Sequence, residues 1–294
     1  MSRRVVLTDA QWERISEVLP SSEGCVGRPF RDHRQVVEGI VYRYRTGIAW
    51  RDLPEEFGPW QTVWKRHRRF SLDGTWDKLL TRLLADADAA GEIDWSVSVD
   101  STINRAHQHA ATLSRNTGGI DELYTNPLVE PADHALGRSR GGLSTKVHHA
   151  CDGRGRLLVV LVGPGQAGDA PMLPFILGAI RVPRHGVGRA RTRPDRVLAD
   201  KAYSSRAIRR LLRSRGIQAV IPEPRDQQAH RKRRGRRGGR PVGYDTEAYK
   251  HRNVVERSFN ALKNWRGLAT RYDKLAVIYR GGAVLAAILA WLRG

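Results

Sequence analysis

The order of apolar and amphipathic segments after residue 93 most constrains what this chain can fold into. That order is strand, hairpin, helix, strand, helix, strand, and it predicts an α/β architecture with a mixed sheet and helices on its faces. The predicted strands are 95–99, 143–150, 156–162, 196–199 and a run within IQAVIPE, and the predicted helices are 170–180 and SRAIRRLLRSRG. Residues 101–142 are expected to form a polar, irregular connection.

The N-terminal third predicts helices instead. Thr8 and Gln11 have the spacing of a capping box, with Leu7 placed to pack on Trp12. A second helix is expected over DHRQVVEGIVYRYRTG, where apolar residues recur at helical spacing. Pro59 opens a further helix after the short helix and turn RDLPEEFG. We therefore expect an all-α domain over residues 1–92 and an α/β domain over 93–294.

The helix that follows Pro59 is rich in basic and aromatic side chains. A short turn with glycine before such a helix is typical of a helix-turn-helix. The alternative is a small helical domain with a solvated basic face, and local sequence alone does not separate the two. The candidate DNA-binding residues here are Trp60, Trp64, Lys65, Arg66, Arg68 and Arg69.

The net charge favours DNA binding. The 51 Lys and Arg residues against 30 Asp and Glu give a formal charge of +21. So large an excess indicates an anionic partner, and nucleic acid is favoured over acidic membrane. The N-terminus lacks the features of a signal peptide. The apolar run 276–292 contains Arg280 and is shorter than the ~20 residues of a membrane span, so a buried closing helix is expected. Cys25 and Cys151 make neither a disulfide framework nor a zinc quartet, which favours a reducing cytoplasm.

Two predicted strands lead into an aspartate, Asp100 and Asp200. In open sheets, functional side chains gather at strand ends, so neighbouring strands would bring both carboxylates to one place. Like charges raise each other's pKa unless a cation settles between them. Carboxylate oxygens suit Mg²⁺, so the pair predicts a magnesium site.

Glu256 is the candidate third carboxylate, on a predicted helix YKHRNVVERSFNALK. Seven residues return a helical side chain to within ~20° of its starting direction, so Tyr249, Glu256 and Lys263 share one stripe beside Arg252. A third acid would complete a two-metal site. The alternative is a surface ion pair of Arg252 and Glu256, worth only ~0.3–0.5 kcal/mol, and helix spacing alone favours that alternative.

Three motifs together resemble those of bacterial insertion-sequence DDE transposases, specifically the insertion-sequence-five family. They are VDST with Asp100, LADKAY with Asp200, and a Tyr-x2-Arg-x3-Glu-x6-Lys signature formed by Tyr249, Arg252, Glu256 and Lys263. The stretches HALGRSRGGLSTKVH, GQAGDAP, GRPVGYD and WRGLATRYDK are also similar to the family. The resemblance extends from about Leu7 to the C-terminus.

The resemblance implies an RNase H-like catalytic domain behind a DNA-binding module. It implies an enzyme with two Mg²⁺ (or Mn²⁺) ions that cleaves DNA at the terminal inverted repeats of its element and joins the ends to target DNA. Asp100 would bind both ions, with Asp200 and Glu256 binding one each, and Tyr249, Arg252 and Lys263 would position the DNA end. A homodimer or higher oligomer is expected in the complex with two ends. The alternatives are a catalytically inactive DNA-binding regulator and a structure-selective nuclease of the same fold.

Weaker signals give further expectations. A basic loop at about 225–243 is expected to contact phosphate, which gives affinity but little sequence information. Its candidate residues are Arg231, Lys232, Arg233, Arg234, Arg236 and Arg237. Trp265 could stack on a base or belong to the core.

Other patterns lead to less specific interpretations. GPGQAG is interpreted as a turn and not as a dinucleotide fingerprint. His107, His109, His148 and His149 do not have zinc-site spacing and are expected to bond phosphate or lie near the site. Residues 118–133 are long and acidic for the family, which puts DNA contacts by that loop in doubt.

Overall fold

The computed structural model describes residues 7–22, 29–115 and 126–293. The N-terminal helices are α1 (Asp9–Ser16), α2 (His33–Thr46), α3 (Trp60–Leu72) and α4 (Thr75–Ala89). The strands are β1 (Ser96–Ala106), β2 (Gly137–Ser139), β3 (Gly142–Cys151), β4 (Leu157–Pro164), β5 (Arg196–Leu198), β6 (Gln218–Val220) and β7 (Thr270–Arg271). The later helices are α6 (Leu173–Ala179), α7 (Arg206–Ser214), α8 (Arg225–Arg233), α9 (Thr246–Lys250), α10 (Asn253–Lys263), α11 (Arg266–Ala269) and α12 (Ala276–Trp291).

The helical N-terminal region is confirmed, and the short helix and turn predicted at RDLPEEFG are two 3₁₀ turns, Trp50–Asp52 and Glu55–Phe57, followed by Gly58. The Thr8–Gln11 capping box opens α1, and Gly47 ends α2 in the left-handed conformation, with φ 74°. Residues 47–59 separate α2 from α3 and contain two 3₁₀ turns. That connection is longer than the three or four residues of a helix-turn-helix. Leu53 and Phe57 anchor it in the core.

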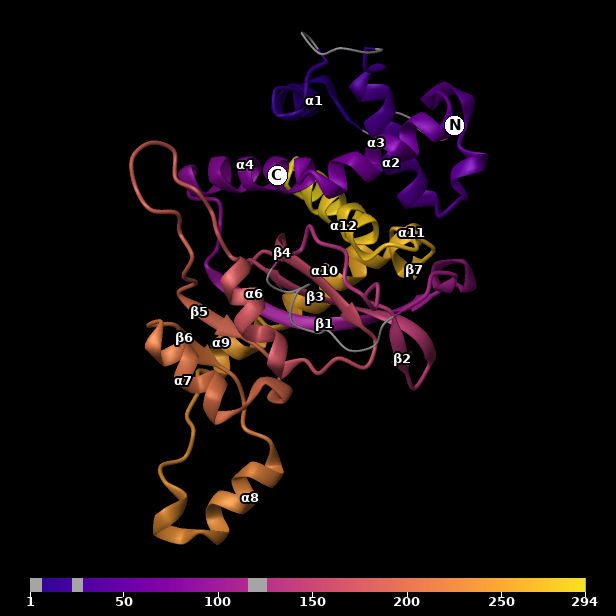
Figure 1. Ribbon diagram of the computed structural model, residues 1–294. Coiled ribbons are helices and arrows are strands. Elements are labelled where there is room, and N and C mark those ends of the chain that lie inside the picture. The colour runs from indigo at the N-terminus through magenta and orange to yellow at the C-terminus, as the bar shows by residue number, and fades with distance from the viewer. Residues whose placement is uncertain (1–6, 23–28, 116–125, 294) are drawn as a thin grey trace.

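A mixed sheet forms the centre of the described structure, as expected (Figure 1). β1 pairs antiparallel with β3 and parallel with β5, which pairs parallel with β6. The predicted strand end at Asp100 was wrong, because β1 continues to Ala106. The reason is tertiary: residues 101–105 are paired along β3. Part of the expected irregular stretch is therefore strand, here and in β2.

Helices cover both faces of this sheet. Helix α6 packs on β3 and β4, and α10 packs on β1 and β3 from the other side (Figure 1). The closing helix α12 is buried along almost all of its length and lies between the sheet and α2–α4. Its Arg280 is neutralised by Asp77 of α4, at 2.5 Å. No helix among the described residues is long and apolar enough to cross a membrane.

One hydrophobic core spans the predicted boundary at residue 92. It runs from Leu7 to Leu292 and includes side chains from both predicted domains. Gly282 of α12 allows the close approach, since a Cβ atom there would collide with the ring of Tyr44. The N-terminal helices are thus docked on the α/β region by buried packing.

A second link between these regions is a buried polar cluster around His67. Trp76 Nε1 donates to His67 Nδ1 at 3.2 Å, and Tyr44 Oη donates to Asp273 Oδ2 at 3.0 Å. His67 Nε2 lies 3.1 Å from the carbonyl oxygen of Ile278. Because Nδ1 accepts a hydrogen bond, the ring must be neutral here. Burial accordingly lowers the pKa of His67 to about 4.

The stability of the protein is expected to fall as pH is lowered from about 6.5 to 4. In that range the unfolded state binds a proton at His67 that the folded state excludes. One such histidine lowers the free energy of unfolding by up to about 1.4 kcal/mol per pH unit. His148 and His149 are also buried with a lowered pKa, so their slopes add to it. Urea denaturation at pH 7, 6 and 5 measures how steeply the free energy of unfolding falls with pH. His67→Gln should make this slope smaller by the contribution of one histidine. Equal slopes in the wild-type protein and the variant would contradict the assignment of this effect to His67.

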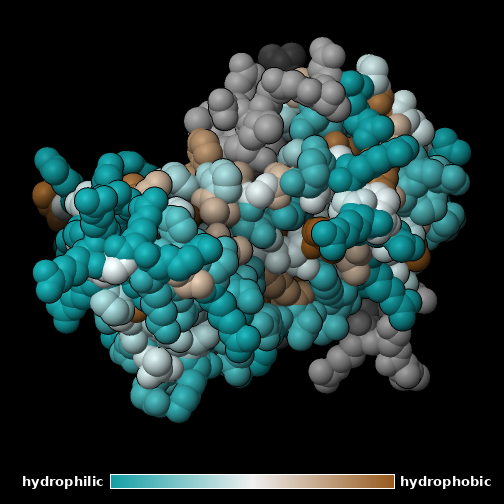
Figure 2. Space-filling model, turned by 90° about the horizontal axis from the view of Figure 1, so that it is seen from below, coloured by the Kyte–Doolittle hydropathy of each residue, from teal (hydrophilic) through white to brown (hydrophobic). Residues whose placement is uncertain are grey.

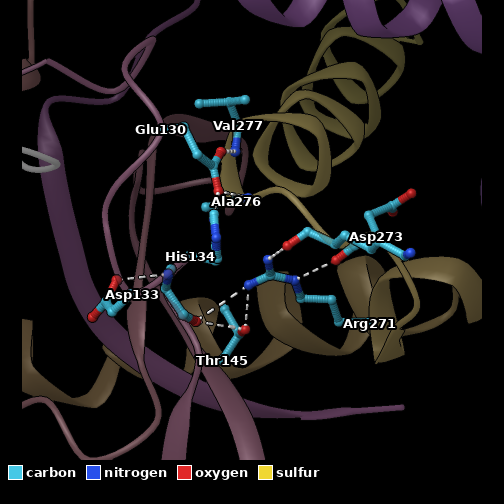
Figure 3. A network of polar contacts seen from close by, with 10 residues as sticks. Glu130, Asp133, His134, Thr145, Arg271, Asp273, Ala276 and Val277 are labelled. Atoms are coloured by element: carbon cyan, nitrogen blue, oxygen red, sulfur yellow. Dashed lines mark hydrogen bonds and ion pairs between the residues drawn. The ribbon is translucent and has the colours of Figure 1, made fainter. Parts of the chain in front are cut away.

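The acidic stretch before β2 and the segment before α12 meet in a buried network (Figure 3). Glu130 accepts hydrogen bonds from the backbone N–H groups of Ala276 and Val277, at 2.8 and 3.0 Å, and so caps α12. Arg271 donates to the carbonyl oxygen of Asp273 and to Thr145 Oγ1. The described part of residues 118–133 therefore has structural partners, while 118–125 lie outside the described residues.

Candidate active site

The two strand-borne aspartates lie side by side. Ser98 of β1 pairs with Leu198 of β5 in parallel register. Asp100 comes two residues after Ser98, and Asp200 comes two residues after Leu198. The strands β1 and β5 are neighbours, which was the condition for the two aspartates to meet, so Asp100 and Asp200 lie at the same level of the sheet. Asp200 accepts a hydrogen bond from the N–H of Ala202 at 2.8 Å. The chain therefore turns away from the sheet directly after Asp200.

Asp100 is a largely buried carboxylate. Burial raises its pKa, and the neighbouring charges of Asp200 and Asp169 act in the same direction. The N–H of Ser101, which donates at 2.8 Å, and the guanidinium of Arg252 act against this rise. The cluster thus carries more negative than positive charge, an arrangement that favours a bound cation.

The predicted signature helix is interrupted. α9 ends at Lys250 and α10 begins at Asn253, so Tyr249 and Glu256 are on different helices. The interruption places Arg252 at the start of α10, where Nη2 is 2.5 Å from Asp100 Oδ2. Its Nη1 is 3.0 Å from Glu256 Oε1. Arg252 therefore connects Glu256 to the aspartate cluster, and the pair with Glu256 is more than a local surface contact.

The packing of α10 on β3 places Glu256 one turn from the contact with the strands. His149 stands opposite Asp100 on β3 and stacks on Phe259 of α10, with ring centroids 3.7 Å apart. Glu256 lies one turn before Phe259 and remains exposed, with 61% of its side chain accessible. Its carboxylate is paired with Arg252 and remains accessible to a ligand from solvent.

The chemical type of the donors suits a divalent cation. Asp100, Asp200 and Glu256 offer only carboxylate oxygens, the ligands that Mg²⁺ prefers. Within the described part of the chain, no three acidic, histidine or cysteine side chains converge closely enough to form a metal site. The guanidinium of Arg252 instead holds positive charge between two of the three carboxylates.

Asp169 is a fourth acid in this region that was not predicted. It accepts a hydrogen bond from Ser101 Oγ at 2.5 Å and pairs with Lys146 Nζ at 3.1 Å. The signal was present in the family-like stretch GQAGDAP, but an acid in a turn cannot be paired with β1 from sequence spacing. GPGQAG begins with the last two residues of β4 and continues into the turn that follows, as interpreted.

The histidines divide into two groups. His148 and His149 are fully buried opposite Ser101 and Asp100, so of the two expectations they meet the position near the site and not the bonding of phosphate. Burial lowers the pKa of His148 to about 4 and of His149 to about 3, which keeps both rings neutral. His107 and His109 stay partly accessible and contact each other, with centroids 4.5 Å apart.

The remaining signature residues differ in exposure. Tyr249 is half-buried, and burial raises its pKa, while Arg252 acts in the opposite direction. Lys263 is exposed at the last turn of α10, seven residues after Glu256. Trp265 has only 7% of its surface accessible and belongs to the core, beneath the guanidinium of Arg45. Of the two roles weighed for Trp265, its position supports packing over base stacking.

The basic helix α3 presents most, but not all, of its predicted residues. Lys65, Arg68 and Arg69 are exposed around Trp64, where a shallow cavity of about 570 Å³ lies. Trp60 is half-buried near Arg51. Arg66 is buried, because its guanidinium packs 4.0 Å from the ring centroid of Phe30 and contacts His33. Burial therefore argues against the predicted DNA contact of Arg66.

The expected basic loop is an arm with helical structure. Residues 225–233 form α8 and a 3₁₀ turn follows at Gly235–Gly238, because this stretch holds helix-forming residues after Pro224. The arm extends away from the sheet (Figure 1). Seen from below, from the end of the molecule to which the arm extends, the surface is mostly hydrophilic (Figure 2). Arg231 pairs with Glu223 at its base, so that arginine is engaged within the protein. Lys232, Arg233, Arg234, Arg236 and Arg237 are exposed.

A cleft with a volume of about 820 Å³ lies between the base of the arm and Asp200. It is lined by the acidic residues Asp200, Glu223 and Asp226 together with Lys201, Arg225 and Gln228, among others.

Comparisons with known proteins agree on one family. Residues 7–80 match a family model described as a putative transposase of the IS4/5 family, and residues 94–291 match one described as a transposase DDE domain. An uncharacterized protein of Sinorhizobium fredii is 38% identical over 38% of this chain and 86% of its own length. An uncharacterized 16.2 kDa protein of insertion element IS402 from Burkholderia cepacia is 38% identical over 34% of this chain and 74% of its own length. A putative transposase of insertion element IS6501 from Brucella ovis is 30% identical over 51% of this chain and its full length. No solved structure was found to match.

Proposed function

Because the chain belongs to the insertion-sequence transposases with a DDE domain, we propose that it binds the terminal inverted repeats of its element, cleaves the DNA ends and joins them to target DNA. The observation that carries the proposal is the arrangement of Asp100 on β1 and Asp200 just after the neighbouring strand β5, with Arg252 bridging Asp100 and Glu256. The mixed sheet with helices on both faces and the domain match support an RNase H-like fold.

Asp100, Asp200 and Glu256 would hold two Mg²⁺ (or Mn²⁺) ions. Such ions activate a water or a 3′-hydroxyl and stabilise the leaving oxygen of the scissile phosphate. The carboxylates supply the negative charge and fix the positions of these ligands. Arg252 lies between two of them and has a planar fork of donors, which suits a phosphate of the DNA end. Tyr249 and Lys263 flank the same surface and would position the neighbouring phosphates.

Two basic surfaces would bind the duplex away from the chemistry. The exposed face of α3 is the proposed reader of the terminal repeats, through Trp60, Trp64, Lys65, Arg68 and Arg69. The α8 arm would hold phosphates next to Asp200. A soluble protein of the cytoplasm, acting as a dimer or larger assembly on two DNA ends, fits this proposal.

The test incubates the purified chain with a labelled duplex that carries the terminal inverted repeats of its element and Mg²⁺. We expect nicking at the repeat ends and joining to a second duplex, both absent in Asp100→Asn. Equal products from wild type and Asp100→Asn would refute the enzymatic proposal. Tight binding of the ends without cleavage would favour an inactive regulator, and equal cutting of random-sequence duplex would favour a structure-selective nuclease.

Removing positive side chains from the α8 arm is expected to lower the affinity for DNA and to make that affinity less dependent on salt concentration. Replacement of Lys232, Arg233 and Arg234 by Ala leaves the Arg231–Glu223 pair that fixes the arm. Each lost phosphate contact reduces the slope of log affinity against log salt by about 0.9, so a reduction of roughly two to three is expected. Fluorescence anisotropy at several salt concentrations measures the slope. Arg82→Ala on α4 is the control and should leave it unchanged; an unchanged slope in the triple variant would show that the arm does not bind phosphate.

A further inference from the structure

Ser101 links Asp169 to Asp100, because it donates a hydrogen bond to each of them. Ser101 Oγ donates to Asp169 Oδ1 at 2.5 Å, and the Ser101 N–H donates to Asp100 Oδ1 at 2.8 Å. Adjacent strand residues point to opposite faces of a sheet. Asp169 therefore holds β1 from the face opposite α10, while Asp100 stands on the face that α10 covers.

Asp169 is itself fixed in place. Lys146 of β3 donates to Asp169 Oδ1 at 3.1 Å and to the carbonyl oxygen of Ala167 at 2.6 Å. Lys146 stands opposite Ile103 in the β1–β3 pair, so it shares the face of Ser101. Only 11% of the Lys146 side chain is accessible, against 29% of Asp169. A nearly buried cation is costly without an anion, so the pair is expected to be persistent.

The turn that carries Asp169 lies directly on the strands. A Cβ atom on Gly165 would collide with Ser144 of β3, and one on Gly137 of β2 would collide with Gln166. His148, on the same face, has its Nδ1 4.0 Å from Asp169 Oδ1, and its ring is held neutral by burial. Lys146 is thus the cation that balances Asp169 within this cluster.

We propose that Asp169 is a positioning residue that fixes Ser101 and, through its N–H, the orientation of the Asp100 carboxylate. The inference rests on the proposed function, because Asp100 is its target. Reacting groups must be held to within about 0.5 Å of their productive positions. Loss of the Asp169–Ser101 hydrogen bond should therefore slow DNA nicking without lowering the affinity for DNA.

The test is a double-mutant cycle in the full-length protein. Single-turnover nicking of the terminal-repeat duplex, per folded molecule, is measured for Asp169→Ala, Ser101→Ala and the double variant, together with the DNA concentration at half-maximal rate and the melting temperature. We expect each single variant to nick at least about tenfold more slowly at an unchanged half-maximal DNA concentration. Asp169→Ala should also lower the melting temperature, because Lys146 loses its anion, whereas Ser101→Ala should leave it nearly unchanged. The double variant should be no slower than the slower single one, because both act through one hydrogen bond. Asp86→Ala is the matched control, since Asp86 is 32% accessible and ion-paired to Arg82 on α4.

Three results would overturn the inference. Nicking by Asp169→Ala at the wild-type rate would remove the role, as would a double variant whose loss is the product of the two single losses. A lower melting temperature with a normal nicking rate per folded molecule would show that Asp169 only stabilises the turn that carries it. Absence of nicking by the wild-type protein would instead refute the proposed function, and the role of Asp169 with it.

Discussion

Replacing Glu256 by Gln is expected to reduce DNA nicking by about 10³-fold or more. If Glu256 holds a divalent ion, the change removes a charged ligand and several kcal/mol of stabilisation of the transition state, and each 1.36 kcal/mol corresponds to tenfold in rate. If Glu256 only pairs with Arg252 at the surface, the cost is a few tenths of a kcal/mol of stability and the rate stays nearly unchanged. The two interpretations differ by orders of magnitude in one measurement.

Glu247 provides the control for this prediction. It is exposed, 78% of its side chain being accessible, and it pairs with Lys250 within one helical turn, as Glu256 pairs with Arg252. Glu247→Gln should nick at the wild-type rate. Both variants should keep the wild-type melting temperature and DNA affinity. Wild-type nicking by Glu256→Gln would exclude Glu256 from the reaction.

Replacing Arg271 by Leu is expected to lower the free energy of unfolding by about 3–5 kcal/mol. Arg271 is fully buried and donates to three backbone carbonyl groups and Thr145 Oγ1 (Figure 3). Leucine leaves these buried acceptors without donors and removes the positive charge beside Glu130 and Asp273. Urea denaturation measures the loss, which should appear equally by fluorescence and circular dichroism.

A neighbouring arginine tests whether burial is the cause. Arg105 lies on β1 next to β7, where it pairs with Thr270, and its side chain is exposed. Arg105→Leu should change the free energy of unfolding by no more than about 0.5 kcal/mol. Arg271→Lys should also be destabilising, because an ammonium group cannot reach four separated acceptors in a plane. Equal effects of the two leucine variants would contradict the network as the source of stability.

Local patterns predicted most elements correctly because their causes are local. The capping box of Thr8 and Gln11, the glycine that ends α2 and the turn before Arg156 depend on neighbours within a few residues. The apolar run of α12 predicted a buried helix because no polar face was available. The end of β1 was missed because its last residues are polar, and they form a strand only through pairing with β3.

The sequence alone predicted Asp100 and Asp200 from acids after apolar runs, and Glu256 from a four-residue signature that resembles a known family, since all of these are visible in one dimension. It also determined the charge that indicates a nucleic acid partner. Only the tertiary structure decided which side chains meet. It broke the signature helix at Arg252 and so connected Glu256 to Asp100, it buried Arg66, His148 and His149, and it brought Asp169 to Ser101. The physical reason is that burial and pairing depend on which strands and helices become neighbours, and spacing along the chain carries no record of those long-range contacts.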